Sequence, residues 1–565
     1  MADHYDQKPW LKFYDKHVPA SLQCPDKPFW EFIEPSINGF PKRVGLQYMG
    51  TSFTFKQLDE MANRFANMLK KIGLQKGDTV GVNLPNLPAY YICLLGIQKA
   101  GCVLSGVSPL LTAAELNHQL KDSGTKVLVT LDAFYPRVAQ GSAGTQLKAI
   151  VFTGIADYLP AIKATLGKML KKIPTGKVLP IPGIDIYHFK EVMKSLPTSP
   201  VSEKVSMDDV CIMQYTGGTT GLPKGAELTQ RNVVAMVTQL STWLDTKPGA
   251  EVGMSAFPLF HISGLAFGML LLATGNTQIA VPNPRDQKFL VASFKKYKPS
   301  IVANVPTVYM ELMKMPEFRA LDFSNVKYFA SGGAPYPPEY IKDFEKVVGG
   351  SKLVEIYGLT ETGPITASPR DGKKKAGSVG VPFPDIQVKI VDPETGEPVT
   401  FNEPGEIAVK GAQVSARGYF KKPEETANAL RNGWFHTGDI ARMDEEGYIT
   451  IVDRLKDMVN VSGYKVFTRE LDDVIMEHPD VFMGASVGIP NPDRPGTEMV
   501  ATAIMLNPGI EKSDAEKTKI IEYLKGKVAP YKVPKKLEFM DELPLSAVGK
   551  VLKRELKVKF KSEAK

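Results

Sequence analysis

The spacing of apolar residues in the first half of the chain alternates between a helical period and short runs of strand-forming residues. Residues 55–78 carry apolar side chains at helical spacing and end near a glycine, and residues 89–101 repeat this pattern. Short strand-like runs lie at 79–86, 127–131 and 149–154. Helices that alternate with buried strands predict parallel sheets that are covered by helices on both faces.

The pattern changes after about residue 370. The stretches SVGVPFPDIQVKIVDPETGEPV and GEIAVKG read as short strands joined by Gly/Pro turns, which predicts a small β-rich unit. After YITIVDRLKDMV, helix-like stretches (470–478 and 516–528) return together with strand-like ones (485–489 and 500–506). A separate small α/β unit is therefore expected at the end of the chain.

Composition narrows the class of protein. The chain has 565 residues, 43% hydrophobic and 23% charged, as in ordinary globular proteins, and its length predicts several domains. The net charge of +8 is mild, so we expect no nucleic-acid partner. Residues 550–565 hold seven basic and two acidic side chains. This basic tail is either a solvated surface or a weak attraction to anionic lipid or phosphate.

Four cysteines without a CxxC pair indicate neither a zinc site nor a disulfide framework, and they fit a reducing, cytoplasmic compartment. The first residues, MADHYDQKPW, lack the order of a signal peptide. The most apolar run, residues 262–275, is shorter than the ~20 residues that span a bilayer, so a buried helix is expected there.

The stretch YTGGTTGLPKG, residues 215–225, is the first candidate for chemistry. Glycines let backbone N–H groups approach an anion, and hydroxyls with a lysine add further donors. These donors favour phosphate as the ligand. The pattern is not the GxxxxGK[ST] loop, because Pro223 precedes Lys224 and Gly225 follows it. Taken alone, the stretch favours phosphate binding but is also compatible with a flexible turn.

Five further polar or glycine-rich stretches interrupt the hydrophobic pattern downstream: SGGAP (331–335), EIYGLTETG (355–363), WFHTGD (434–439), DRLKDMVNVSGYKV (453–466) and PLSAVGKVLKREL (544–556). In this order and at these separations, the six motifs resemble the adenylate-forming superfamily of acyl-CoA synthetases, firefly luciferase and peptide-synthetase adenylation domains. The resemblance covers residues 40–556. The stretch at 432–456 is similar to the one typical of fatty acyl-CoA synthetases, and YTGGTTGLPKG is similar to the loop variant common in bacterial long-chain enzymes.

This resemblance implies an α/β fold with a large N-terminal domain of two parallel α/β subdomains plus a small β-rich subdomain, followed by a small mobile C-terminal α/β domain. The implied boundaries are residues 1–455 for the ATP- and acyl-binding domain, Lys456 for the hinge and 457–565 for the mobile domain. It also implies a two-step reaction, in which a carboxylate attacks ATP to give acyl-AMP and CoA then displaces AMP. No protein nucleophile is needed, so the enzyme positions reactants and stabilises charge.

The resemblance assigns roles residue by residue. For ATP binding it implies Thr216, Gly217, Gly218, Thr219, Thr220, Lys224, Gly333, Ala334, Pro335, Tyr357, Asp439 and Arg454. For Mg²⁺ it implies Thr216 and Glu361, for the α-phosphate Thr360, and for the CoA channel Ser462, Gly463 and Tyr464. For the acyl group it implies Gly264, Leu265, Ser331 and Gly332, with Trp243 as a further candidate, although the apolar run 265–273 fits a plain core equally well.

Two implied catalytic residues have plain structural alternatives. Lys550 would bridge the α-phosphate and the attacking carboxylate, or it is one more lysine of the basic tail. His261 would act between the two half-reactions, or it is a structural histidine at the start of an apolar helix. The departures at Asn460, Thr468 and the pair Ala547–Val548 remove no charge that adenylation needs, and Thr468 is expected only to loosen a turn.

Three functions remain open: a medium- or long-chain fatty acyl-CoA synthetase, which we favour, an aryl or phenylpropanoid CoA ligase, and an adenylation enzyme that loads a carrier protein. No acidic residue in the acyl region is evident to hold an amino group. The chain ends 15 residues after Lys550, so a fused carrier is not expected. The expected small molecules are a fatty acid, ATP and CoA, with Mg²⁺ as cofactor. A homodimer and peripheral contact with the inner face of a membrane are kept open.

Overall fold

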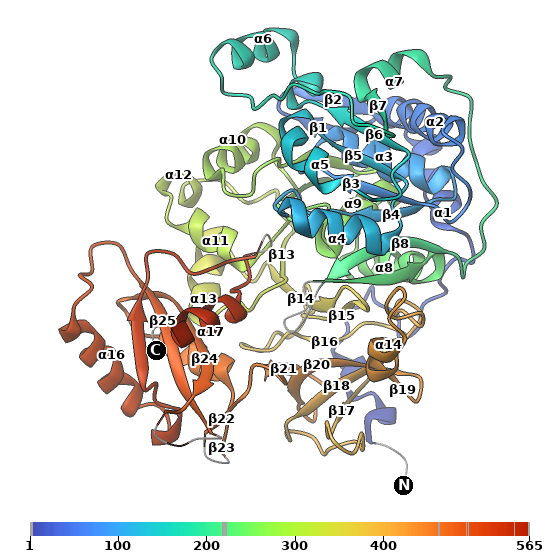
Figure 1. Cartoon of the computed structure of the whole chain (residues 1–565). Coiled ribbons are helices and arrows are strands. Elements are labelled where there is room, and N and C mark those ends of the chain that lie inside the picture. Colours follow the sequence, from blue (N-terminus) through green and yellow to red (C-terminus); the bar gives the residue numbers. More distant parts are fainter. Residues whose placement is uncertain are drawn as a thin grey trace.

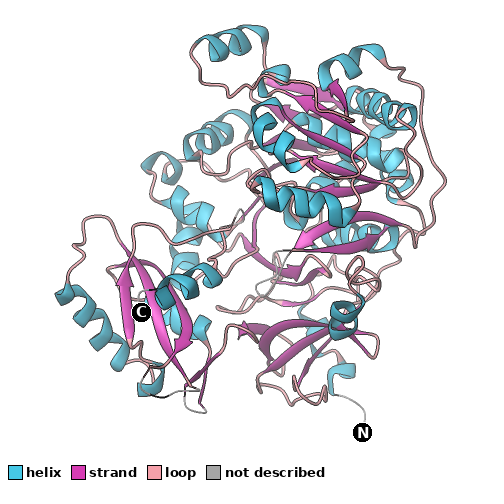
Figure 2. Ribbon diagram, viewed as in Figure 1, coloured by secondary structure: helices cyan, strands magenta, loops and turns pink. Residues whose placement is uncertain are grey.

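The computed structural model describes residues 4–216, 223–461, 464–492, 494, 497–546 and 549–562. Figure 1 shows two stacked α/β layers that make up most of the molecule, a β-rich unit below them and a separate C-terminal unit, coloured orange to red, at their side. Figure 2 shows helices around the sheets of the two layers and few helices beside the sheet of the β-rich unit. The described part of the chain contains no helix long and apolar enough to cross a membrane.

Within the described ranges, the first layer is a seven-stranded sheet in which only the last pair, β8 and β9, is antiparallel. The order of its strands is β7 (Asp185–His188), β6 (Ala149–Thr153), β5 (Val127–Leu131), β3 (Thr79–Asn83), β4 (Val103–Gly106), β8 (Val210–Thr216) and β9 (Lys224–Thr229). The predicted strands at 79–86, 127–131 and 149–154 are confirmed.

The helices of this layer are α2 (Phe55–Lys71), α3 (Pro88–Lys99), α4 (Ala113–Ser123), α5 (Tyr135–Gly141), α6 (Ala161–Met169) and α7 (Phe189–Ser195). Helix α2 begins with two reciprocal hydrogen bonds. The Thr54 side chain accepts from the Gln57 N–H, and the Gln57 side-chain oxygen accepts from the Thr54 N–H. Every residue of α3 is buried, which explains its apolar composition on all sides.

The second layer, over the described residues, is a nine-stranded sheet with a parallel centre and antiparallel edges. Its strand order is β16 (Val381–Pro382), β15 (Gly363–Ala367), β14 (Leu353–Leu359), β13 (Tyr328–Gly332), β12 (Ile301–Asn304), β10 (Val252–Ser255), β11 (Thr277–Ala280), β1 (Val44–Tyr48) and β2 (Thr51–Thr54). The polar stretches at 331–335 and 355–363 follow or end strands here.

The helices of the second layer are α1 (Phe29–Gly39), α8 (Gln230–Trp243), α9 (Ile262–Ala273), α10 (Gln287–Tyr297), α11 (Pro306–Met313), α12 (Pro316–Arg319) and α13 (Pro338–Val348). Short 3₁₀ turns lie at His4–Gln7, Pro9–Phe13, Asp132–Phe134, Ile155–Tyr158 and Pro530–Lys532. Helix α9 confirms the buried helix that the apolar run at 262–275 predicts, since ten of its residues are buried.

The β-rich unit is confirmed as a five-stranded antiparallel sheet among the described residues. It comprises β17 (Gln387–Val391), β18 (Gly405–Lys410), β19 (Leu430–Arg431), β20 (Trp434–Met443) and β21 (Ile449–Arg454), with α14 (Pro423–Ala429) beside it.

The C-terminal unit has its own sheet. It contains the hairpin β22 (Val459–Val461) and β23 (Tyr464–Val466), the strands β24 (Val481–Pro490), β25 (Glu498–Leu506) and β26 (Lys536–Phe539), and the helices α15 (Thr468–Met476), α16 (Asp514–Lys525) and α17 (Lys553–Ser562). It packs on the second layer, because Phe482 and Leu543 share a hydrophobic cluster with Tyr309 and Phe344. The hinge at Lys456 and the exact domain limits stay predictions.

Candidate active site

A cavity of about 240 Å³ lies where the second layer, the β-rich unit and the C-terminal unit meet. Seven of its lining residues are ones that the sequence assigns to ATP binding or catalysis: Gly333, Ala334, Pro335, Tyr357, Asp439, Arg454 and Lys550. They come from five separate segments of the chain, so the fold, rather than local sequence, brings them together.

Asp439 is the centre of the polar part of this cavity. Its Oδ2 accepts a hydrogen bond from the Tyr357 hydroxyl at 2.7 Å, and its Oδ1 lies 2.9 Å from the Arg454 Nε. Asp439 and Arg454 face each other because strands β20 and β21 pair at this register. Burial, reinforced by the Asp439 charge, raises the pKa of Tyr357, so its hydroxyl keeps its proton and acts as a donor.

Glycines let the chain pass close to this cavity after strand β13. Gly333 has φ +80°, a backbone conformation that residues other than glycine rarely adopt. A Cβ on Gly332 would lie 2.7 Å from the Ile356 carbonyl oxygen of strand β14. The SGGAP motif therefore forms a flat wall of backbone, and Ser331, Gly332 and Ala334 also line the cavity.

A second polar cluster surrounds Glu361. The Tyr419 hydroxyl donates to Glu361 Oε1 at 2.7 Å, and the Lys224 ammonium lies 5.2 Å from the centre of the Tyr419 ring. Thr216 faces Lys224 in the β8–β9 pair. Burial raises the pKa of Glu361, although the Tyr419 hydrogen bond opposes that shift. Thr360, next to Glu361, is also buried.

Lys550 reaches the cavity from the C-terminal unit. The preceding residue, Gly549, has φ +70°, and a Cβ there would lie 2.4 Å from the Thr307 hydroxyl. The close approach of the backbone to Thr307 therefore requires glycine at this position. The Lys550 N–H donates to the Ser546 hydroxyl at 3.1 Å. Burial, followed by repulsion from the Arg454 guanidinium, lowers the pKa of Lys550 to about 7. Lys550 therefore does not lie in a solvated tail, which the plain alternative required.

His261 caps the apolar helix α9. Its Nδ1 lies 2.8 Å from the Ser263 hydroxyl and accepts from the Ser263 N–H at 3.3 Å. Burial, with the nearby Lys550 charge, lowers the pKa of His261 to about 4, so the ring is neutral at pH 7. The structural role is therefore present, and a catalytic role stays a prediction.

Six assigned residues are not described by the structure, and a seventh, Tyr464, does not line the cavity. Gly217, Gly218, Thr219, Thr220, Ser462 and Gly463 lie outside the described residues. Tyr464 is exposed and stacks on Tyr531, with ring centres 4.7 Å apart. It does not line the cavity. The one described residue of the proposed CoA face is therefore exposed and lies outside the nucleotide cavity in this arrangement.

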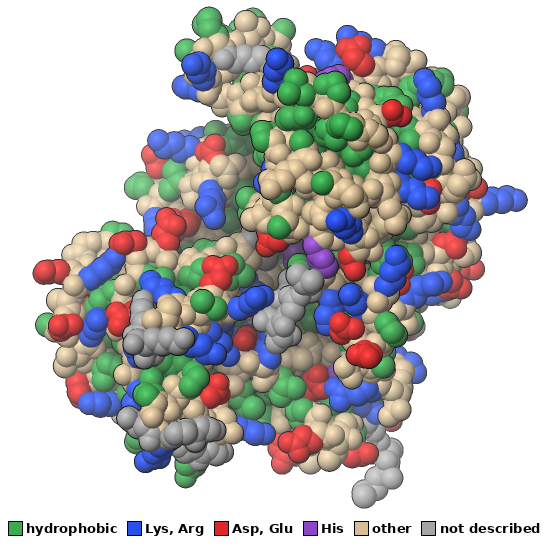
Figure 3. All heavy atoms as spheres, in the orientation of Figure 1, with side chains coloured by type: hydrophobic (Ala, Val, Ile, Leu, Met, Phe, Trp, Pro, Cys, Tyr) green, Lys and Arg blue, Asp and Glu red, His purple; other side chains and the backbone are tan. Residues whose placement is uncertain are grey.

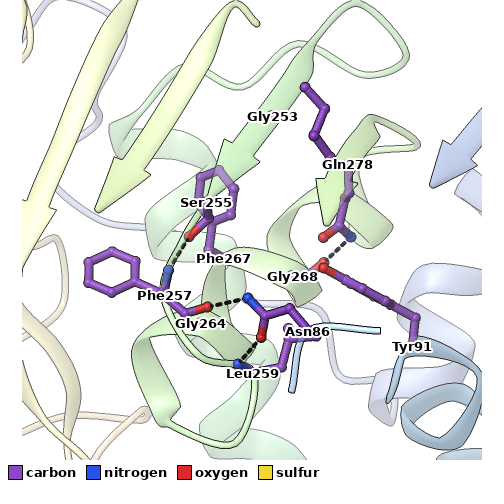
Figure 4. A pocket seen from close by; sticks show the side chains of 11 residues that line it. Asn86, Tyr91, Gly253, Ser255, Phe257, Leu259, Gly264, Phe267, Gly268 and Gln278 are labelled. Atoms are coloured by element: carbon purple, nitrogen blue, oxygen red, sulfur yellow. Dashed lines mark hydrogen bonds between the residues drawn. The ribbon is translucent and has the colours of Figure 1, made fainter. Parts of the chain in front are cut away.

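The acyl-binding assignment is divided between two places. Ser331 and Gly332 line the large cavity, whereas Gly264 lines a separate small cavity of about 10 Å³ behind α9. Figure 4 shows Asn86 and Gln278 beside this small cavity, each bonded to backbone groups. A space of that size holds about one water molecule and no acyl chain.

Two further acyl candidates belong to the core. Leu265 is fully buried in α9 and lines neither cavity. Trp243 is also fully buried, donates its indole N–H to the Ser368 carbonyl at 3.1 Å and packs on Tyr14 and Phe383. The suggestion that Trp243 contacts the acid is therefore wrong for this arrangement, because its side chain is enclosed by core residues.

Sequence reasoning missed a polar network beneath Lys550. The Thr468 hydroxyl donates to Asp453 Oδ2 at 3.0 Å, and Lys553 donates to the same hydroxyl at 2.6 Å and to Asp472 Oδ2 at 2.9 Å. Thr468 was expected only to loosen a turn, and this is wrong because it is fully buried and bridges two units. Asp453 and Lys553 are both visible in the sequence, but their connection through the Thr468 hydroxyl depends on the tertiary fold.

Comparison with known families identifies two matching models. Residues 33–420 match the AMP-binding enzyme model, and residues 470–550 match the AMP-binding enzyme C-terminal domain model. Among curated relatives, the long-chain-fatty-acid–CoA ligase of Bacillus subtilis is 38% identical, with 97% of this chain and 98% of the relative aligned. The ligase of the same description from Escherichia coli O157:H7 is 37% identical, with 98% of each chain aligned.

Solved structures show the same architecture. An anthranilate CoA ligase, AuaEII, in complex with anthranoyl-AMP superposes with a TM-score of 0.83 at 24% identity, covering 97% of this chain and all of that one. ATP-bound MatB from Rhodopseudomonas palustris superposes with a TM-score of 0.79 at 26% identity, covering 95% and 100%. The first likeness is one of fold alone.

Proposed function

Because the chain belongs to the AMP-binding enzyme family, we propose that it is an ATP-dependent ligase that joins a long-chain fatty acid to CoA. The carboxylate attacks the α-phosphorus of ATP and pyrophosphate leaves. The CoA thiolate then attacks the acyl carbon and AMP leaves. The observation that carries the proposal is that Lys550, from the C-terminal unit, lines the same cavity as Asp439 and Tyr357.

The proposed roles follow from the contacts of the cavity. Asp439 accepts from the ribose hydroxyls, since a carboxylate with donors fixed on both oxygens is held in one orientation. The wall of Gly333 to Pro335 and the Tyr357 ring enclose the base. Lys550 stabilises the negative charge that grows on the oxygens between carboxylate and α-phosphate, an interaction strongest in the transition state.

Mg²⁺ is the cofactor that this chemistry implies, and Glu361 and Thr216 would hold it. The donor set fits, because a carboxylate and a hydroxyl are hard oxygen ligands, and phosphate oxygens and water would supply the others. Burial raises the pKa of Glu361, and a neighbouring cation would favour its ionised form. When bound, the cation neutralises phosphate charge.

Thioester formation requires a second arrangement of the C-terminal unit. In the present one, Tyr464 is exposed and Lys550 lines the nucleotide cavity. We propose that rotation about Lys456 withdraws Lys550 and turns the segment around Tyr464 toward the acyl-AMP. Rotation about one residue suffices where its backbone dihedrals are unrestricted.

The substrate assignment rests on the names of the relatives, and one panel tests it. Purified protein is mixed with ATP, Mg²⁺ and CoA and offered unbranched acids from C4 to C18, together with cinnamic and benzoic acids. Mass spectrometry reads acyl-CoA and AMP. A maximum between C12 and C18 is expected. A maximum with cinnamic or benzoic acid would assign an aryl ligase, and acyl-AMP without thioester would assign a carrier-protein acceptor.

A further inference from the structure

Helix α6 and the chain that follows it, residues 161–179, form a segment that stands off the seven-stranded sheet. Figure 1 shows α6 projecting at the top of the molecule. Among its residues whose side chains the structure describes, none is buried. The segment is tied to the body near its ends, where Lys163 donates to the Met49 carbonyl at 3.2 Å and where Gly176 packs against the Asp132 backbone.

This segment concentrates the exposed apolar side chains of the described chain. Of nine exposed large hydrophobic residues there, five lie within it: Ile162, Leu166, Met169, Leu170 and Leu179. Ile162 is 76% exposed and Met169 is 69% exposed. Of the first four, Ile162, Leu166 and Met169 follow the spacing i, i+4 and i+7 and share one face of α6, and Leu170 comes directly after the last residue of the helix. We call them the apolar stripe.

The returning chain does not cover the apolar stripe. Ile173 folds back over Gly167, where a Cβ would lie 2.4 Å from the Ile173 side chain. The turn is made at Lys171, whose φ is +53°. One side of α6 is thereby occupied by its own chain, while the apolar stripe stays open to solvent. Exposed apolar side chains that lie in a cluster mark interaction surfaces, whereas apolar side chains that are exposed singly are common on protein surfaces.

Charge identifies the kind of partner. Between residues 158 and 184 the sequence contains five lysines, at 163, 168, 171, 172 and 177, and no acidic residue. Figure 3 shows basic and hydrophobic side chains next to each other over α6. A short helix with one apolar face and lysines around it matches a surface that is apolar inside and anionic at its boundary.

We propose that residues 161–179 dock the enzyme on an anionic lipid bilayer. The apolar stripe enters the boundary between headgroups and acyl chains, and the lysines lie among the phosphates. The benefit to catalysis rests on the proposed function, because a long-chain acid partitions into the bilayer and would be taken up where it is concentrated. The docking itself needs neither ATP nor CoA.

Helix α17 supplies the matched control surface. It is also basic, with Lys557, Lys559 and Lys561, but its apolar residues Leu556 and Phe560 are buried against the C-terminal sheet. Its remaining apolar residue, Val558, is 62% exposed, so α17 offers charge with a single exposed apolar side chain in place of a stripe. Loss of three lysines from residues 161–179 and of three from α17 compares equal changes in net charge at two places.

The experiment is sedimentation of the full chain with vesicles, without substrates. Vesicles contain phosphatidylcholine alone or phosphatidylcholine with about one third phosphatidylglycerol. The variants are the triple substitutions I162S/L166S/M169S, K171Q/K172Q/K177Q and, as control, K557Q/K559Q/K561Q. Thermal melting and acyl-CoA formation with a short soluble acid check that each variant is folded.

The wild type is expected to bind the anionic vesicles, and both α6 variants to bind at least about tenfold more weakly, since apolar insertion and charge both contribute. The α17 variant should lose less than about threefold. No binding by the wild type, or greater loss in the α17 variant, would overturn the proposal. So would a wild-type dimer that the α6 variants convert to monomer, because a second copy would then cover the stripe. Failure of the proposed function would appear only in the acid panel.

Discussion

The Thr468 hydroxyl lies 3.0 Å from Asp453 Oδ2, and this hydrogen bond joins the first turn of α15 to the strand that precedes the proposed hinge. The Thr468 N–H donates to the same carboxylate, and Lys553 donates to the Thr468 hydroxyl. These contacts connect the C-terminal unit to β21 while Lys550 lines the nucleotide cavity. They stabilise the arrangement that we propose for adenylation, in which Lys550 lines the cavity.

The substitution Asp453→Asn removes the charge from this contact and weakens the arrangement that holds Lys550. Hydrogen bonds to a charged group contribute roughly 1.5–3 kcal/mol, so adenylation should slow by about tenfold or more. Thioester formation from supplied acyl-AMP should be unchanged, because it does not use this arrangement. Single-turnover measurements of the two half-reactions check the difference.

Asp541→Asn is the control for that prediction. Asp541 is exposed and pairs with Lys512 within the C-terminal unit, so its loss should affect neither half-reaction. If Asp453→Asn slowed both half-reactions equally, Asp453 would act through the stability of the whole fold and not through the closed arrangement.

The substitution Tyr419→Phe removes the hydroxyl that donates to Glu361. The carboxylate then loses a donor that favours its ionised form, so we expect the concentration of Mg²⁺ for half-maximal rate to rise severalfold. Tyr523→Phe is matched, because its hydroxyl donates to the exposed Glu477 at 3.3 Å and neither residue lines the cavity. If Tyr419→Phe required the same concentration of Mg²⁺ as the wild type, the proposal that Glu361 holds the cation would be contradicted.

The pKa of Lys550, lowered to about 7 by burial, predicts a pH dependence. A lysine with a lowered pKa loses its proton as the pH rises through that value, so the ammonium charge of the free enzyme declines above about pH 7. The KM for ATP should therefore rise from about pH 7 to about pH 9. Lys550→Arg keeps its charge and should flatten that rise. If the KM for ATP still rose with pH in Lys550→Arg, the rise would come from another group, such as Lys456. Burial lowers the pKa of Lys456 to about 8.

The sequence predicted the elements whose pattern is local. The strands at 127–131 and 149–154, the buried α9 and the β-rich unit all follow from apolar periodicity and turn residues. The meeting of Tyr357, Asp439, Arg454 and Lys550 was expected only through the family resemblance, because no local pattern encodes a contact across about 200 residues.

Features that depend on packing escaped prediction. Thr468 seemed a neutral replacement in a turn, yet it is buried between Asp453 and Lys553. Trp243 seemed available to a substrate, yet Tyr14 and Phe383 enclose it. A side chain's partners at such distances in sequence are set by the arrangement of whole sheets, which one residue's type does not specify.

The hinge assignment predicts a different division of the two half-reactions. Lys456→Pro fixes φ at this position and restricts Leu455 before it, so rotation of the C-terminal unit should be hindered. Acyl-AMP formation should stay near the wild-type rate while thioester formation slows at least about tenfold. Lys456→Ala controls for loss of the side chain. Equal slowing of both steps by Lys456→Pro would reject the hinge role.

The most direct test of the account is the rate of each half-reaction in Lys550→Ala. We predict that acyl-AMP formation from ATP and a long-chain acid falls by at least about a hundredfold, because the transition state loses its cation. Conversion of supplied acyl-AMP and CoA to acyl-CoA, and the melting temperature, should stay near the wild-type values. Wild-type rates of acyl-AMP formation in Lys550→Ala, or equal loss of both steps, would contradict the account.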